Sequence, residues 1–116
     1  MSYEILKRAI ETRQSLTGVY DDYVRFFSPH VLGRNVRGQL IVIGFQYGGG
    51  RPEGMLPPEG TWCVFAIDHL HRLEPNGDEL VEGQLDNRPV GLMVEIDADS
   101  SVAEATSARS APIGGV

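Results

Sequence analysis

The most restrictive feature of this sequence is a change in the spacing of its apolar residues at Leu16. Before that point, four apolar residues recur at three- and four-residue spacing, which is typical of an amphipathic helix. They are Ile5, Leu6, Ala9 and Ile10. From Leu16 onward the pattern changes to the period of two that is characteristic of β-strands. The sequence therefore predicts one helix over residues 2–15, followed by a sheet.

The strand-like segments after the helix are short and are separated by turn residues. They are 16–20, 23–28, 39–46 and 62–67, then a helical turn with a short fifth strand in 68–72 that is closed by 74–78, and a candidate sixth strand at 89–97. Turn signals at this spacing predict a small, strongly bent antiparallel barrel of about five strands, with the helix packed against it. Pro29 has no amide hydrogen, so we expect it at a strand end, an edge or a bulge. The glycines and prolines of 48–60 predict a loop.

Length and composition indicate one domain with an appendage. The 116 residues support a domain over 1–84, followed by an extra strand and a weakly structured tail rich in Ala, Ser and Gly within 85–116. No apolar run approaches the ~20 residues of a membrane span, and the N-terminal residues lack the apolar segment of a secretory signal. Cys63 is the single cysteine and cannot form an internal disulfide. These features predict a cytoplasmic protein.

The charge is distributed unevenly along the chain. The net charge is −6, with +2 up to Arg37 and −8 from Gly38 onward. An acidic protein repels a phosphate backbone, which argues against tight nonspecific binding of nucleic acid. The asymmetry still allows a local basic face around Arg25, Arg34 and Arg37.

Several short motifs follow one another in a characteristic order along residues 2–75. They are Ala9-Ile10 and Arg13 in the helix, Tyr20, Arg25 through Gly33 with Pro29-His30 inside it, Gln46 through Gly50, Trp62, and Ile67 through Leu70. This order resembles the WYL domain family, and most closely its short standalone bacterial proteins. The resemblance implies a mainly β, α+β fold, with an N-terminal helix on a five-stranded antiparallel Sm-like or SH3-like barrel.

The resemblance also implies a function and shows where this chain departs from the family. WYL domains are thought to sense ligands, often nucleotides or nucleic acid, through basic and polar residues on one face of the barrel. The Trp-Tyr-Leu tripeptide that names the family is missing, and the corresponding strand reads Leu40-Ile41-Val42-Ile43. Cys63 stands where an arginine is often expected after the tryptophan, and His69 is the basic residue of the last turn.

The predicted binding face centres on Arg25 and His30. A guanidinium can hold a phosphate through two parallel hydrogen bonds, and nearby aromatic rings can stack on a base. The supporting contacts that we expect are Tyr20, Arg34, Gln46 and His69. Each residue also has a simpler structural interpretation: Arg25 as a surface partner of Asp21 or Asp22, and His30 as a buried imidazole that fixes the strand end.

Neither catalysis nor a bound metal is predicted. His69 and His71 would share a face of a strand, but a metal site needs three or four ligands, and only His30 and Cys63 remain as further soft donors. The glycine run at 48–50 lacks the Gly-Lys-Ser/Thr ending of a phosphate loop. The sequence thus favours a non-enzymatic ligand-sensing or regulatory domain without a cofactor, binding a nucleotide or short nucleic acid weakly. The alternative is a protein–protein module that forms a homodimer through residues 89–97.

Overall fold

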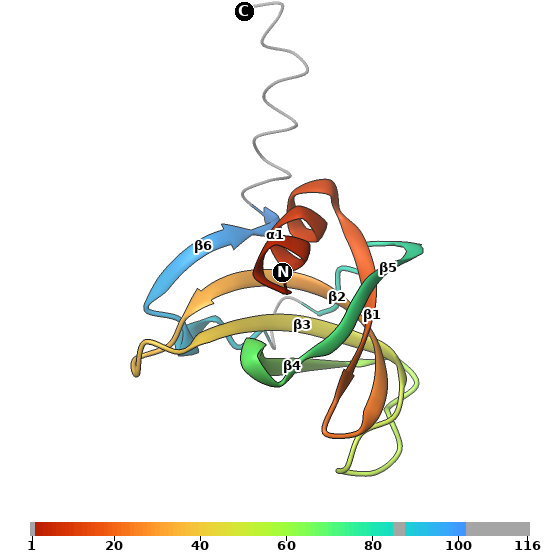
Figure 1. Ribbon diagram of the computed structural model, residues 1–116. Coiled ribbons are helices and arrows are strands. Elements are labelled where there is room, and N and C mark those ends of the chain that lie inside the picture. Colours follow the sequence, from red (N-terminus) through yellow and green to blue (C-terminus); the bar gives the residue numbers. More distant parts are fainter. Residues whose placement is uncertain (1, 85–87, 102–116) are drawn as a thin grey trace, which may run out of the picture.

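The computed structural model describes residues 2–84 and 88–101 (Figure 1). The expected tail falls mostly outside these residues. The elements in chain order are α1 (Ser2–Thr12), β1 (Gln14–Tyr20), β2 (Tyr23–Arg34), β3 (Leu40–Gly49), β4 (Thr61–Ala66), η1 (Ile67–His69), β5 (His71–Glu79), η3 (Val90–Leu92) and β6 (Glu95–Asp99). The predicted mainly β architecture is confirmed: one N-terminal helix packs on a curved antiparallel sheet in a small barrel-like fold.

The sheet is built around β2. Its strand order is β4-β3-β2-β1-β5, and β6 pairs with β2 outside this path. One edge of β2 lies along β3, while the other edge has two successive partners. Residues 23–27 of β2 pair with β1, and residues 31–34 pair with β6. A gap between these two partners therefore falls at residues 28–30.

β2 extends well beyond the predicted end at Ser28. Opposite β3, Pro29 pairs with Gly44 and Val31 pairs with Ile43, so that His30 is the extra residue of a β-bulge. A bulge tolerates a proline because the ladder is already interrupted there. The bulge was one of the three positions that the sequence allowed for Pro29, and it lets the strand continue to Arg34.

The hydrophobic core lies between α1 and the sheet. Leu6, Ala9 and Ile10 of the helix are buried in it. The sheet side of the same cluster consists of Leu16, Phe27, Leu32, Val42, Phe65, Ile67 and Leu70. Burying one large aliphatic side chain contributes roughly 1.5–3 kcal/mol, so this packing holds a helix that would be marginal alone. Figure 1 shows α1 lying across the curved sheet.

The helix is shorter than the predicted 2–15. It ends at Thr12, and Arg13 adopts a left-handed conformation with φ of 55°. This single residue reverses the chain direction, so that β1 starts at Gln14. A left-handed residue of this kind commonly terminates a helix, and it is usually a glycine or an asparagine. Because the residue here is an arginine, the sequence gave no signal that the helix ends at this point.

The C-terminal strand lies later in the chain than the predicted 89–97. Val90–Leu92 forms a short 3-10 helix, and the strand itself is Glu95–Asp99, paired with β2 of the same chain. Gly33 makes this pairing feasible, because a Cβ at that position would lie 1.9 Å from the carbonyl oxygen of Glu95. Within residues 2–84 and 88–101, no helix is long and apolar enough to cross a membrane.

Candidate functional site

Arg25 lies almost completely buried at the β1–β2 end of the sheet, with 3% of its surface exposed. Its Nη1 donates a hydrogen bond to Gln46 Oε1 at 3.1 Å, and its Nη2 donates to the carbonyl oxygen of Tyr20 at 3.1 Å. Both acceptors are neutral. Three of the predicted site residues therefore come together: Tyr20, Arg25 and Gln46.

The charge of Arg25 has no carboxylate partner among the described residues. In particular, it makes no ion pair with Asp21 or Asp22. Its Nε is buried and has no hydrogen-bond partner in this part of the chain. Aromatic rings surround the guanidinium instead, with its central carbon 5.5 Å from the ring centre of Tyr20 and 5.4 Å from that of Phe65. Since a buried charge is normally paired, this arrangement is suited to an anion supplied from outside.

A pocket of about 240 Å³ opens beside this guanidinium. Its lining consists of Tyr20, Asp21, Arg25, Arg51, Glu53, Trp62, Cys63, Val64 and Phe65. The pocket thus combines two guanidinium groups with aromatic walls, and the exposed carboxylates of Asp21 and Glu53 accompany them. It is the cavity in which the predicted ligand-binding residues Tyr20 and Arg25 meet.

Gln46 fixes the position of the Arg25 guanidinium through the hydrogen bond that its Oε1 accepts. It is fully buried, and its Nε2 donates to the carbonyl oxygens of Gly48 and Gly50 at 2.9 and 3.0 Å. These two bonds set the orientation of the amide, so that Oε1 faces Arg25. The same residue therefore ties the pocket to the glycine run that follows β3.

Arg51 is a second basic residue that the sequence analysis did not single out. It follows the glycine run directly and lines the same pocket as Arg25. Its Nη2 donates to the carbonyl oxygen of Met55 at 3.1 Å, and its Nε is buried without a partner among the described residues. The only sequence signal was an arginine inside a long Gly/Pro-rich loop, a type of segment in which function is often placed.

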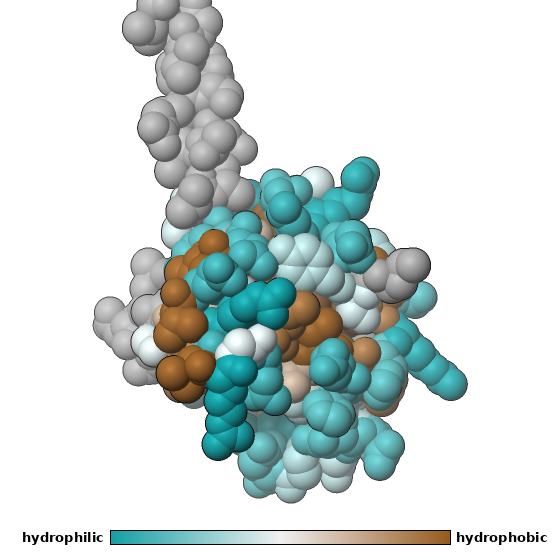
Figure 2. All heavy atoms as spheres, turned by 60° about the vertical axis from the view of Figure 1, so that its left-hand side comes forward, coloured by the Kyte–Doolittle hydropathy of each residue, from teal (hydrophilic) through white to brown (hydrophobic). Residues whose placement is uncertain are grey.

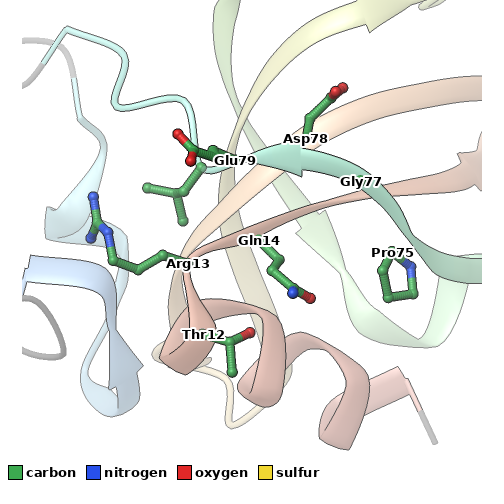
Figure 3. Close-up of a pocket in the computed structure, with 8 residues that line it drawn as sticks. Thr12, Arg13, Gln14, Pro75, Gly77, Asp78 and Glu79 are labelled. Carbon is green, nitrogen blue, oxygen red and sulfur yellow. The ribbon is translucent and has the colours of Figure 1, made fainter.

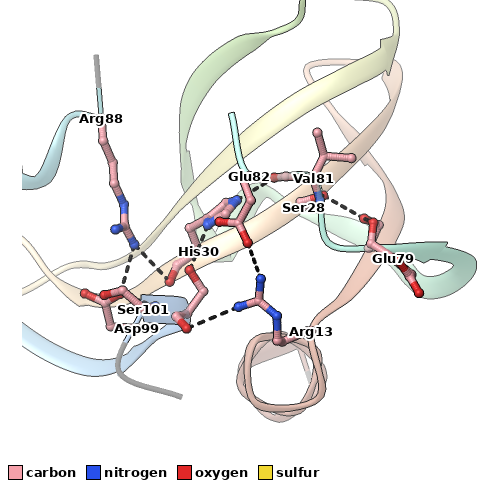
Figure 4. Close-up of polar contacts among 11 residues, drawn as sticks. Arg13, Ser28, His30, Glu79, Val81, Glu82, Arg88, Asp99 and Ser101 are labelled. Atoms are coloured by element: carbon pink, nitrogen blue, oxygen red, sulfur yellow. Dashed lines mark hydrogen bonds and ion pairs between the residues drawn. The ribbon is translucent and has the colours of Figure 1, made fainter. Parts of the chain in front are cut away.

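His30 does not join this pocket. It belongs to a polar network in the gap along β2 (Figure 4). One ring nitrogen, Nε2, lies 2.7 Å from the carbonyl oxygen of Val81, and the other, Nδ1, lies 2.8 Å from Ser100 Oγ. Ser28 belongs to the same network, accepting a hydrogen bond from the amide of Val81 at 2.8 Å. His30 and Ser28 thus hold the chain that follows β5 against β2.

Two arginines close this network at its edges. Arg13 bonds to Glu82 and to the carbonyl oxygen of Ser100. Arg88 pairs with Asp99 at 2.9 Å and lies 3.5 Å from the carbonyl oxygen of His30. The network therefore connects α1, β2, β6 and the segment after β5, and its role is structural.

The predicted face centred on both Arg25 and His30 is therefore divided in two. Arg25 lies over Phe65, which packs in the core with Phe27, whereas Ser28 and His30 both contact Val81. Successive side chains of a strand point to opposite faces, so Ser28 and His30, two residues apart, share the face opposite to Arg25 and Phe27. Arg25 and His30 are an odd number of residues apart, so they face opposite sides once the strand continues past Ser28, its predicted end.

Two further predicted contacts also lie elsewhere. Arg34, at the end of β2, is exposed and bonds to Glu95 and to the carbonyl oxygen of Gly38. His69 is exposed in η1. Neither lines the pocket beside Arg25. Phe27 belongs to the core, and the Tyr47 hydroxyl donates to Asp78, so neither ring stands in the pocket.

A larger open groove of about 490 Å³ lies between the end of α1 and β5 (Figure 3). Its labelled side chains point in different directions, as Asp78 and Pro75 show. Arg13 is already bonded to Glu82, and Asp78 accepts from Tyr47. This groove offers no converging polar groups, and the pocket beside Arg25 is the better candidate site.

The described residues contain no group of three or more His, Cys, Asp or Glu side chains placed to hold a metal ion. Comparison of the chain with protein-family models, with curated proteins and with solved structures gave no match. The site is therefore interpreted through its own geometry.

Burial of His30 generates a testable dependence of stability on pH. Burial lowers the pKa of His30 below its ordinary 6.5, although the hydrogen bond to Val81 acts in the opposite direction. The folded state therefore favours the neutral ring, with Nε2–H donating to Val81 and Nδ1 accepting from Ser100. Below about pH 6.5 the unfolded chain binds a proton that the folded chain does not, so the free energy of unfolding falls as pH decreases.

We expect this loss to approach at most about 1.4 kcal/mol per pH unit between pH ~6.5 and ~5, measured by urea unfolding. Burial alone would raise the pKa of Asp99, but hydrogen bonds from Ser101 and Arg88 bring it below the ordinary 3.8, so this carboxyl acts only at lower pH. His30→Gln should flatten the profile, whereas His69→Gln at an exposed position should not. A wild-type profile that is flat across this range would contradict the assignment.

Proposed function

We propose that this protein is a non-enzymatic ligand-sensing domain that binds an anionic group at Arg25, with the phosphate of a nucleotide as the favoured ligand. The observation that carries the proposal is the buried guanidinium of Arg25, a residue that lines the pocket. Its hydrogen-bond acceptors are neutral, it has no carboxylate partner among the described residues, and its buried Nε has no partner there. Arg51 supplies a second positive charge to the same pocket.

The size of the pocket supports a head group rather than a complete ligand. At about 240 Å³, it lies below the ~300–1,000 Å³ that is usual for small-molecule sites. A phosphate and part of a sugar suit this volume, while the base would extend outside. Tyr23 is exposed, and its ring centre lies 6.0 Å from the central carbon of the Arg25 guanidinium. Stacking of a base on such a ring contributes roughly 1–3 kcal/mol.

The electrostatics favour weak and salt-sensitive binding. The protein carries a net charge of −6, and Asp21 and Glu53 line the pocket beside the two arginines. These charges oppose the approach of an anion, and salt screens the attraction of the guanidinium groups. Weak reversible binding fits a sensor or regulatory domain. The resemblance to WYL domains supports the same role, and a cytoplasmic location belongs to the proposal.

The test is an amide-shift NMR titration at low salt with inorganic phosphate, a nucleoside monophosphate and a short single-stranded oligonucleotide. We expect shifts at Tyr20, Arg25 and Gln46 at millimolar phosphate, with tighter binding of the nucleotide if its base stacks on Tyr23. Arg25→Gln and Arg51→Gln should each weaken binding by about tenfold or more, because each removes a charge-assisted hydrogen bond.

Arg37→Gln is the matched control, since it removes the same charge at an exposed position outside the pocket. If Arg25→Gln does not fold, Arg51→Gln still tests the site, because Arg51 lines the same pocket. Shifts that are spread over surface arginines and equally lost in Arg37→Gln would show nonspecific attraction and refute the site, as would no response to any of the three anions.

Homodimerisation through the C-terminal strand is the second candidate function, and a specific surface feature favours it. β6 pairs with β2 along one edge, and no strand of the described residues pairs with its other edge. Leu92, Val94 and Ile96 are 52%, 66% and 52% exposed beside it. Figure 2, which brings this side of the molecule forward, shows apolar residues gathered on the surface. A free edge with exposed apolar side chains is suited to strand addition.

For this second candidate, the solution mass from sedimentation equilibrium should correspond to a dimer. Ile96→Lys and Val94→Lys should each shift the mass toward the monomer, because a charge at a strand edge opposes pairing. Val36→Lys is the matched control, as Val36 is also exposed but lies in the β2–β3 turn. A monomeric wild-type protein would rule out the dimer without affecting anion binding.

A further inference from the structure

Cys63 forms part of the wall of the pocket that contains Arg25 and Arg51. It is the single cysteine of the chain, it is a free thiol, and it is partly exposed. It lies on β4, whose residues pair with β3, and packs against the edge of the core cluster. A partly exposed thiol in a pocket wall is accessible to small reagents that enter the pocket.

The thiol and the guanidinium share one anchor. The Sγ atom of Cys63 lies 3.5 Å from Gln46 Oε1, the same oxygen that accepts the hydrogen bond of Arg25 Nη1 at 3.1 Å. An anion held by Arg25 is therefore held within reach of the sulfur. The Arg25 side chain, which lines this pocket, is 3% exposed and has no carboxylate partner among the described residues, so it points independently to an anion there.

We propose that Cys63 is a modification site for small disulfides that carry an anionic group, and that the resulting mixed disulfide blocks the pocket. The proposal rests on the anion-binding function proposed above. Arg25 and Arg51 would bind the carboxylate or phosphate of the reagent, which places its disulfide bond beside Sγ. The selectivity for negative charge comes from this docking step.

The chemistry is ordinary thiol–disulfide exchange. The Cys63 thiol loses its proton to water, and the thiolate attacks one sulfur of the reagent. A bond forms between Sγ and that sulfur, the original sulfur–sulfur bond breaks, and the second half of the reagent leaves as a thiolate. Cys63 is oxidised to the mixed disulfide while the reagent disulfide is reduced, so no further oxidant is required.

Two features of the pocket have opposite effects on the pKa of the Cys63 thiol, and through it on its reactivity. Burial raises the pKa of Cys63, and the nearby Arg25 guanidinium acts against this rise. Because the thiolate is the nucleophile, exchange should be slow at neutral pH and accelerate as pH rises. The pKa of the thiol affects the exchange rate with an anionic and with a neutral disulfide in the same way. The ratio of these two rates therefore reports only how strongly the anionic group binds to the arginines before exchange.

Once formed, the adduct occupies the pocket. With a volume of about 240 Å³, the pocket cannot hold both the adduct and an anionic head group. A carboxylate on the adduct also neutralises the guanidinium groups that would bind the ligand. Modification of Cys63 would thus switch off ligand binding under oxidising conditions, and a reducing thiol would restore it.

The experiment compares two disulfide reagents on the full chain. Dithiobis(nitrobenzoate) carries carboxylates, whereas dithiodipyridine is uncharged at neutral pH, and each releases a coloured thiol that reports the rate. We expect Arg25→Gln to lower the ratio of the anionic rate to the neutral rate by about tenfold, and Arg51→Gln to lower it in the same direction. Arg37→Gln should leave the ratio unchanged.

Inorganic phosphate should slow the anionic reagent but not the neutral one, and the modified protein should lose its amide shifts with phosphate until a reducing thiol is added. An equal rate ratio in wild type, Arg25→Gln and Arg51→Gln would overturn the proposal. If phosphate still shifts Tyr20 and Gln46 in that case, the anion site stands and only the role of Cys63 falls. If phosphate shifts neither residue, both proposals fall.

Discussion

The structure depends on how β2 bridges the gap between its two partners along one edge. β1 pairs with its first part and β6 with its last part, and the bulge at His30 lies between them. His30 is 1% exposed, and both of its ring nitrogens are bonded, to Val81 and to Ser100. Because buried polar groups are costly when unpaired, these contacts stabilise the arrangement. They attach β6 and the segment after β5 to the central strand.

Arg25 also belongs to β2, but it lies near the β1–β2 turn and, among the described residues, has no part in the network around His30. Near this turn, Arg25 donates its hydrogen bonds to the Tyr20 carbonyl and the Gln46 amide, both neutral. A guanidinium that is buried against aromatic rings and held by neutral acceptors is fixed in direction but keeps its charge. Placed beside a pocket, such a group is pre-organised for an anion, since little side-chain entropy remains to be lost on binding.

Much of the fold was predictable because it follows local periodicity. The helix and the antiparallel strands were expected from patterns that span a few residues, whereas the grouping of Tyr20, Arg25 and Gln46 came from the predicted binding face and not from periodicity. The separation of His30 from Arg25 was not predicted, because the strand was expected to end at Ser28. Since β2 continues to Arg34, the odd spacing of the two residues places them on opposite faces. Arg51 was missed because a loop of glycines and prolines has no period from which a side-chain position can be inferred.

The most direct test of the central claim is the arginine side-chain Nε–H correlation spectrum, recorded before and after addition of inorganic phosphate. The account predicts a slowly exchanging Arg25 Nε–H signal that shifts when phosphate binds to the guanidinium, while the Arg37 signal stays in place. An Arg25 signal that exchanges as fast as the exposed arginines, or that does not move while they do, would contradict a buried, anion-receiving guanidinium.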